Sequence, residues 1–205
     1  MHREILTKNQ LQLLPVLRNF SKDYILTGGT AIALHLGHRR SIDFDLFTFK
    51  KIERKSIKNY LVDKKYPVEQ LLYEEEDQIH FLVQGIKITF FRYPFRIEDL
   101  VDFDGIIRIP ELLSLAAMKA HALGGRGKWK DYVDLYFLAR HGFSLRMIIE
   151  KAEALFGETF NGKLFKEQLS YFEDIDYEEE VMYLDEPIPK EDIEQFLIQT
   201  ATEAF

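Results

Sequence analysis

Residues 24–47 read YILTGGTAIALHLGHRRSIDFDLF, and this stretch predicts how the fold begins. Its first residues, Tyr24-Ile25-Leu26, predict a short strand that runs into the glycine pair Gly28-Gly29. The apolar run at residues 31–36 then predicts a helix closed by Gly37. At such a turn the backbone N–H groups and the helix dipole favour a phosphate, although a glycine pair is more often a turn required by close contact between elements. The glycines alone leave both interpretations open.

The same stretch ends in an alternating pattern, which predicts a second strand. Its aspartates, Asp43 and Asp45, are expected on one face of that strand, opposite an apolar face. Neighbouring carboxylates of this kind are oxygen ligands that divalent cations can share, and Mg²⁺ is the natural guest. Between the glycines and the aspartates lie four residues that offer donors for the charge of a triphosphate: His38, Arg39, Arg40 and Ser41.

The flanking sequence alternates between predicted helices and strands. The spacing of Thr7 and Gln10 is that of a capping box and predicts a helix that continues to about Phe20. A basic helix is expected at about residues 52–65. Three further strands are expected at residues 68–73, 79–83 and 86–91.

The second half of the chain is expected to be helical. Pro110 is well placed as the first residue of one helix, a second helix is expected at residues 130–141, and the remainder is expected to be helical and increasingly acidic. We therefore expect a soft boundary near residue 108. It separates a sheet-containing core, 1–108, from a helical region, 109–205, that completes the site.

Composition excludes several classes of protein. The 205 residues are 46% hydrophobic and include no Cys, which removes disulfides, thiolate metal sites and cysteine nucleophiles. No apolar run reaches the length of a signal peptide core or a membrane span, so a cytoplasmic protein without a membrane partner is the default expectation. The formal charge of −7 argues against general nucleic-acid coating.

The charge is unevenly distributed along the chain. Residues 39–65 carry nine basic and four acidic side chains, whereas residues 173–194 carry eleven acids and only Lys190 as a base. Most of the lysines are best interpreted as solvated helix faces. The acidic segment suits a basic partner protein better than it suits RNA.

Lys119 lies in a helix seam that is otherwise apolar, and Asp131 starts the next predicted helix. A short loop between the two helices predicts that these side chains lie close together. Such a pair either holds two helices together as a partly buried ion pair or closes a nucleotide site, and the spacing alone leaves both open.

Three groups of residues together resemble the AbiEii/AbiGii family of toxin nucleotidyltransferases. They are residues 28–31 (GGTA), residues 38–46 (HRRSIDFDL), and residues 118–120 (MKA) followed by Arg126 and residues 130–135 (KDYVDL). The resemblance extends from about Leu11 to Leu138. It implies a DNA polymerase beta-like nucleotidyltransferase fold of the α+β class, a mixed sheet flanked by helices with a helical carboxy-terminal half.

The resemblance also implies roles for individual residues. In that family the glycine pair faces the triphosphate, the paired aspartates bind Mg²⁺, and a lysine and a Lys-Asp element of the helical part complete the site. Carried onto this chain, these residues are Gly28, Gly29, Asp43, Asp45, Lys119 and Asp131. Family members are encoded beside an antitoxin and are similar to enzymes that add nucleotides to RNA, including tRNA.

The sequence departs from the wider superfamily at the third carboxylate. Polymerase-like nucleotidyltransferases usually place this acid on a later strand, but residues 86–91 show Lys87 and Thr89 on their polar face. Asp131 is the expected substitute base. Thr30 is expected to supply a hydroxyl where many relatives have a serine.

The leading hypothesis is Mg²⁺-dependent transfer of a nucleoside monophosphate from an NTP to a hydroxyl, with RNA or tRNA as the acceptor, by the toxin of a toxin–antitoxin or phage-defence pair. The alternative, supported by the missing acid, is a module of the same fold that binds a nucleotide or a partner with weakened catalysis. A third possibility is transfer to an antibiotic or to a protein side chain.

Overall fold

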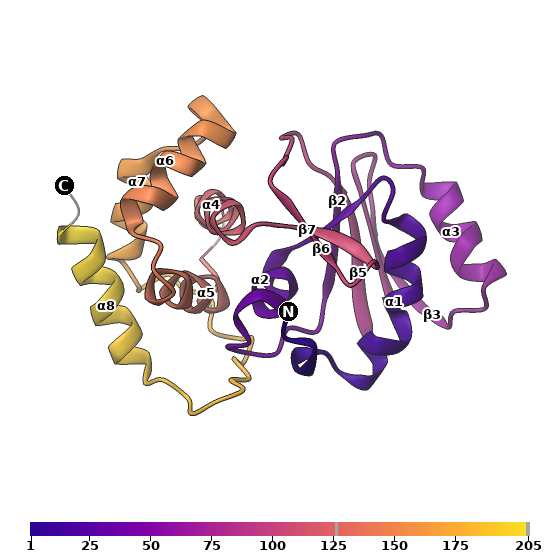
Figure 1. The fold of residues 1–205 in the computed structure, drawn as a ribbon, viewed down its shortest axis with the longest axis horizontal. Coiled ribbons are helices and arrows are strands. Elements are labelled where there is room, and N and C mark those ends of the chain that lie inside the picture. The colour runs from indigo at the N-terminus through magenta and orange to yellow at the C-terminus, as the bar shows by residue number, and fades with distance from the viewer. Residues whose placement is uncertain (126, 204–205) are drawn as a thin grey trace.

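The computed structural model describes residues 1–125 and 127–203, and Figure 1 shows a sheet-containing half beside a half made of helices. The first half contains η1 (Arg3–Ile5), α1 (Lys8–Phe20), β1 (Ile25–Thr27), α2 (Gly28–Leu36), β2 (Phe44–Thr48), α3 (Arg54–Asp63), β3 (Val68–Glu74), β4 (Gln78–Val83), β5 (Ile86–Arg92), β6 (Leu100–Phe103) and β7 (Ile107–Pro110). The second contains α4 (Leu112–Leu123), α5 (Trp129–Arg140), α6 (Leu145–Phe156), η2 (Gly157–Thr159), α7 (Gly162–Leu169) and α8 (Lys190–Glu203).

The main sheet is mixed, with the strand order β1-β2-β5-β4-β3. Its one parallel pair is β2 with β5, and the other neighbours are antiparallel. A parallel pair needs a long crossover, which α3, β3 and β4 provide here. The register places Asp45 between Thr27 on one side and Thr89 on the other. The centre of the sheet therefore carries one of the predicted site residues.

The two faces of the sheet differ in what covers them. On one face α1 and α3 meet β5 through aromatic contacts, because the ring of Phe20 lies 5.2 Å from Tyr60 and 5.0 Å from Phe90 between centroids. On the other side α2 lies between the sheet and the helices α4 and α5 (Figure 1). The site residues on β2 thus face the helical half.

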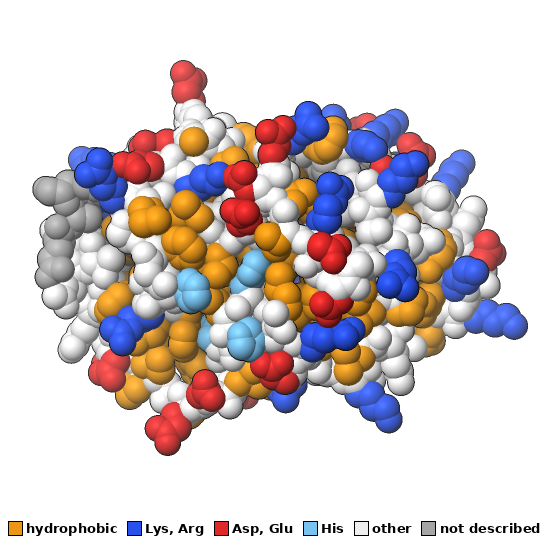
Figure 2. All heavy atoms as spheres, in the orientation of Figure 1, with side chains coloured by type: hydrophobic (Ala, Val, Ile, Leu, Met, Phe, Trp, Pro, Cys, Tyr) orange, Lys and Arg blue, Asp and Glu red, His pale blue; other side chains and the backbone are white. Residues whose placement is uncertain are grey.

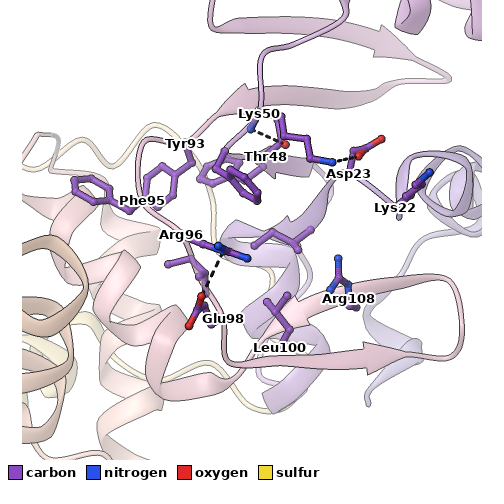
Figure 3. A pocket seen from close by; sticks show the side chains of 14 residues that line it. Lys22, Asp23, Thr48, Lys50, Tyr93, Phe95, Arg96, Glu98, Leu100 and Arg108 are labelled. Atoms are coloured by element: carbon purple, nitrogen blue, oxygen red, sulfur yellow. Dashed lines mark hydrogen bonds and ion pairs between the residues drawn. The ribbon is translucent and has the colours of Figure 1, made fainter.

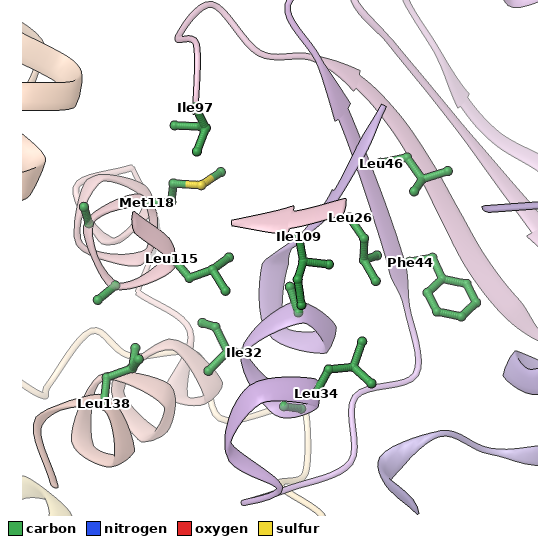
Figure 4. Packing of buried hydrophobic residues seen from close by; sticks show 14 of the residues in the cluster. Leu26, Ile32, Leu34, Phe44, Leu46, Ile97, Ile109, Leu115, Met118 and Leu138 are labelled. Carbon is green, nitrogen blue, oxygen red and sulfur yellow. The ribbon is translucent and has the colours of Figure 1, made fainter. Parts of the chain in front are cut away.

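The core is continuous between the two halves. Ile32 of α2, Leu115 of α4 and Leu138 of α5 are each at most 2% exposed and converge in one cluster (Figure 4). Burying such side chains contributes about 1.5–3 kcal/mol each to stability. This contact fixes the helical half against the glycine turn at the start of α2.

Two expectations about the second half are wrong. Pro110 does not start a helix, because it ends β7 and pairs with Leu100 of β6, and Glu111 is the N-cap of α4. A proline is tolerated at the end of such an edge strand, where its missing N–H costs no ladder bond. The region after α7 is also not helical throughout.

Residues 171–189, which we call the return segment, form turns and single bridges instead of a helix. Pro187 and Pro189 and a run of three glutamates oppose a helix there. The return segment runs back to the first half and forms an isolated bridge between Tyr183 and Arg39. Within residues 1–125 and 127–203, no helix combines the length and the apolar character needed to cross a membrane.

Candidate functional site

The glycine pair allows two charged side chains to approach the start of α2. Gly28 has a φ of +71°, and a Cβ at this position would lie 2.3 Å from Oδ2 of Asp45. A Cβ at Gly29 would lie 2.5 Å from Nη2 of Arg39. Both positions therefore require glycine for close approach, and Gly28 also requires it for its left-handed backbone. The result is a carboxylate and a guanidinium placed at a helix N-terminus.

Asp45 lies within β2, whereas Asp43 precedes the strand, which begins two residues later than expected. Oδ2 of Asp43 lies 2.7 Å from Nζ of Lys87 on β5, and both side chains are partly exposed. Burial opposes the charge of Lys87, but the hydrogen bond and attraction of Asp43 outweigh it and raise the pKa of this lysine. A cation therefore already neighbours one of the two predicted metal ligands.

Thr30 and Ser41 act on the backbone of the loop that leads to the aspartates. The hydroxyl of Thr30 donates to the carbonyl of Asp43, and it lies 3.0 Å from the hydroxyl of Ser41. The amide of Gln10 also donates to the carbonyl of Ser41, at 2.8 Å. In this structure the Thr30 hydroxyl holds residues 41–43 against α2, and the Gln10 amide holds Ser41 against α1.

Asp134 on α5 is the centre of a buried charge cluster. It is fully buried and accepts two parallel hydrogen bonds from Arg39, each 2.8 Å long. His38 Nε2 lies 2.8 Å from the same carboxylate, and Lys119 Nζ lies 3.0 Å from its Oδ2. Lys119 also donates to Asp131 at 2.7 Å. The expected proximity of Lys119 and Asp131 is confirmed.

Asp134, Lys119 and Arg39 stay ionised because they stabilise one another. Burial alone would raise the pKa of Asp134, but the attraction of Arg39 and Lys119 and the hydrogen bonds from His38 and Arg39 hold that pKa well below 3.8. Burial would likewise lower the pKa of Lys119, but Asp131 and Asp134 raise it. Charges this deeply buried persist only when they are paired and hydrogen-bonded.

His38 was predicted only as one of the donors for a triphosphate, and Asp134 was given no role of its own in the sequence prediction. Asp134 lies three residues after Asp131 and so shares its face of α5. This spacing is the signal in the sequence that could have identified Asp134 as a partner of the site. The partnership of Asp134 with Arg39 joins residues 95 positions apart, which no local pattern reports.

The return segment closes the outer side of the Arg39 loop. The N–H of Arg40 donates to the carbonyl of Met182 at 2.8 Å, and the N–H of Leu184 donates to that of His38 at 3.3 Å. Glu179 of this segment lies 2.5 Å from Nζ of Lys128. This hydrogen bond and the neighbouring Lys130 outweigh the effect of burial, which would raise the pKa of Glu179, and lower that pKa to about 2. Part of the acidic segment is thus neutralised within the chain.

A cleft of about 440 Å³ lies between the sheet and α4. Of the predicted site residues, Gly28, Asp45 and Lys119 line it, while Arg39 and Asp131 are buried, each 3% exposed. Lys87 and Thr89, which the sequence places on the polar face of their strand, also line it. Sequence reasoning missed the rest of its wall, which includes Phe47, His80, Phe91, Tyr93, Leu115, Met118 and His121. The cleft combines an apolar side with charged groups at the glycine turn, as small-molecule sites commonly do.

The structure shows what replaces the third carboxylate. Thr89 is paired with Asp45 across the parallel strands, and Lys87 is bonded to Asp43. The buried ion pair of Asp131 with Lys119 does not favour a role as a proton acceptor, so its function as the substitute base stays a prediction. Arg126, which the resemblance includes, lies outside the described residues.

The sequence and the structure of this chain both resemble those of known proteins. The sequence model of the family described as "Nucleotidyl transferase AbiEii toxin, Type IV TA system" matches residues 13–204. The chain belongs to this family. An uncharacterized protein of Aquifex aeolicus (strain VF5) is 38% identical over 179 residues, which are 85% of this chain and 84% of that protein.

Two solved structures share the fold. A Helicobacter pylori protein described as a candidate nucleotidyltransferase superposes with a TM-score of 0.61 at 18% identity, over 95% of this chain and 92% of that one. MenT4, a nucleotidyltransferase toxin of Mycobacterium tuberculosis H37Rv, gives 0.61 at 11% identity, over 95% and 83%. The predicted family and the mixed sheet flanked by helices are therefore confirmed, and the chain is a transferase of the nucleotidyltransferase class.

Proposed function

We propose that this protein transfers a nucleoside monophosphate from an NTP to a hydroxyl of an RNA acceptor, in a reaction that depends on Mg²⁺. The observation that carries the proposal is the position of Asp45. Its carboxylate lies against Gly28 at the N-terminus of α2, in the same cleft as Lys119. A carboxylate beside a helix N-terminus places a cation ligand next to a phosphate-binding turn.

The donor set fits Mg²⁺ delivered with a nucleotide. Among residues 1–125 and 127–203 there is no group of three or more His, Asp or Glu side chains that could enclose a metal. Mg²⁺ is usually held by one or two carboxylates, with water and substrate phosphates as the other ligands. Asp43 and Asp45 provide that number, and they would hold the ion. When bound, it would neutralise charge on the reacting phosphates.

The chain's own residues then position the reactants. The N–H groups at Gly28 and Gly29 bind the polyphosphate, and the buried cluster around Asp134 fixes Lys119 and Arg39 beside it. The acceptor oxygen forms a bond to the α-phosphorus, the bond from that phosphorus to the bridging oxygen breaks, and pyrophosphate leaves. The acceptor's proton passes to solvent or to a base. Because β5 supplies no carboxylate as that base, we expect slow turnover, since a positioned base is worth about 10²–10⁴ in rate.

The family resemblance supports RNA as the class of acceptor. The family is described as the toxin of type IV toxin–antitoxin systems, so we propose that an antitoxin opposes this activity in the cell. The exposed acidic side chains outside the Glu179 contact are the surface we assign to a basic partner.

The test compares Asp43→Asn and Asp45→Asn with the unmodified protein, using labelled NTPs, Mg²⁺ and total RNA. We expect each change to reduce label incorporation at least about a hundredfold while urea unfolding still shows a folded protein. Asp63→Asn, at an exposed carboxylate ending α3, is the matched control and should keep full activity. Full incorporation by both site variants would refute the proposal.

A second candidate function is supported by the Lys87–Asp43 ion pair, which occupies a predicted metal ligand. It is a nucleotide-binding module without turnover. Mg²⁺-dependent NTP binding by the unmodified protein, with no product formed on RNA, protein or small-molecule acceptors, would favour this candidate.

A further inference from the structure

The face of β2 that carries Asp45 continues into a second cavity. Asp45 and Phe47 are two residues apart in this strand, and side chains spaced in this way share one face of it. Phe47 lines the nucleotide cleft and also the second cavity, as does Tyr93. Their rings are 5.1 Å apart between centroids, and they form the wall that the two cavities share.

The second cavity has a volume of about 360 Å³ and is built from four segments of the sheet-containing half (Figure 3). These segments lead into the start of β1, span the end of β2, follow β5 and include part of the β6–β7 hairpin. Its polar lining consists of Lys22, Asp23, Thr48, Lys50, Arg96, Glu98 and Arg108. None of these residues has a role in the proposed transfer of the nucleotide.

The lining is basic in a protein that is acidic overall. Four cations and two acids line the cavity, although the whole chain carries a formal charge of −7. Lys50 is paired with Asp23 at 2.5 Å, and Arg96 is 3.4 Å from Glu98. Among the side chains that the structure describes, Lys22 and Arg108 have no acidic partner within 4.0 Å. Both are exposed, so their charge is available to an anion.

Aromatic rings line the same cavity as these cations. Phe49 is 52% exposed, which is unusual for a side chain of this size, and the guanidinium of Arg96 lies 5.2 Å from the centre of its ring. Phe95 stands edge-on to Tyr93, with 5.4 Å between ring centroids. An exposed ring in a cavity that is also lined by unpaired cations suits a ligand that has both a flat base and a phosphate. Sites for single-stranded nucleic acids combine these two features.

We propose that this cavity binds a nucleotide of the single-stranded RNA acceptor, upstream of the 3′ hydroxyl that enters the cleft. The base stacks on Phe49 and the phosphates are bound by Lys22 and Arg108. The shared wall of Phe47 and Tyr93 lets one strand pass from this cavity to the cleft. The proposal rests on the proposed function, because it takes RNA as the acceptor.

The first test removes the two unpaired charges. Lys22→Gln/Arg108→Gln is compared with the unmodified protein for binding of a short fluorescent single-stranded RNA, by anisotropy at several KCl concentrations. We expect the affinity to fall about tenfold or more at low salt. The slope of log K against log [KCl] should fall by about 1.4, because each phosphate contact on a single strand contributes about 0.7. Lys64→Gln/Lys163→Gln, which changes the net charge equally at exposed sites elsewhere, should leave the slope unchanged.

The second test changes the stacking surface. Phe49→Leu keeps an apolar side chain but removes the ring, and we expect RNA affinity to fall between about fivefold and about a hundredfold. Phe49→Trp restores a stacking surface and should bind within about threefold of the unmodified protein. NTP affinity, measured separately by calorimetry with Mg²⁺, should not change in either variant.

The outcomes separate this proposal from the proposed function. If RNA binding responds to both tests but no variant or parent incorporates label, the transferase proposal fails and the RNA site stands. If label is incorporated and RNA binding ignores Lys22, Arg108 and Phe49, the RNA site is refuted. A loss of NTP affinity in Phe49→Leu would also refute it, because the cavity would then hold the base of the NTP.

Discussion

Replacing Asp134 with asparagine tests whether the buried cluster stabilises the protein as a set of charges. The amide has nearly the same shape, so no cavity forms, but the guanidinium of Arg39 loses the carboxylate that it contacts twice at 2.8 Å. Lys119 loses one of its two acidic partners. Removing one partner from a buried ion pair costs about 3–5 kcal/mol, because a buried charge is left uncompensated. We expect Asp134→Asn to lower the free energy of unfolding by that amount.

The assay is urea unfolding followed by circular dichroism. With a slope of about 2–3 kcal/mol per molar urea, the expected loss lowers the midpoint by about 1–2.5 M. Asp63→Asn removes an exposed carboxylate and should change stability by less than about 0.5 kcal/mol. If Asp134→Asn also loses less than about 1 kcal/mol, the cluster contributes little net stability and the reasoning is refuted.

The same carboxylate sets part of the acid sensitivity. Because the folded protein holds the pKa of Asp134 well below its usual 3.8, its contribution is fully present above pH 3.8 and is lost as the pH falls through the folded pKa. We expect the free energy of unfolding to decrease on acidification below pH 3.8, and this component to be absent from Asp134→Asn. Parallel pH profiles for the two proteins would contradict the assignment.

Two further predictions concern the nucleotide cleft. Gly28→Ala places a methyl group 2.3 Å from the Asp45 carboxylate. We expect it to reduce transfer about a hundredfold in the labelling assay, because displacing a reacting group by about 1 Å reduces the rate by about that factor. Gly85→Ala, at a φ of +72° with open space around it, is the control and should keep activity. Lys87→Gln removes the ammonium that is bonded to Asp43. Because this positive charge repels a cation, Mn²⁺ should bind the variant about fivefold more tightly in a spectroscopic titration. Weaker binding would show instead that the lysine holds the carboxylate in place.

Local chemistry made several elements predictable from the sequence. The capping box predicted at Thr7 is present, with Gln10 N–H donating to the Thr7 hydroxyl at 3.2 Å. Gly37 ends α2 in the left-handed conformation, as its position after an apolar run indicates. The contact between Lys119 and Asp131 was predictable because only a short loop separates their helices. Each of these depends on residues that are close in sequence.

What the sequence did not reveal depends on long-range contacts. The β6–β7 hairpin has strands of only four residues, and Pro110 resembled a helix start until its pairing with Leu100 was known. Asp134 takes its importance from Arg39, which no periodicity connects to it. Neither the sequence pattern nor the fold tests statements about ligands or about separate structural units. The statements that stay predictions for this reason are the boundary near residue 108, the roles of the site residues, the metal and the RNA acceptor.

The return segment has a consequence for how the protein is made. The loop that carries Arg39 obtains backbone partners from Met182 and Leu184, and its side chain obtains its acid from α5. A ribosome therefore releases the whole sheet before it has synthesised the residues that hold this loop. A chain that ends before residue 182 lacks those residues, so the loop of Arg39 reaches its final geometry only after the return segment has been synthesised.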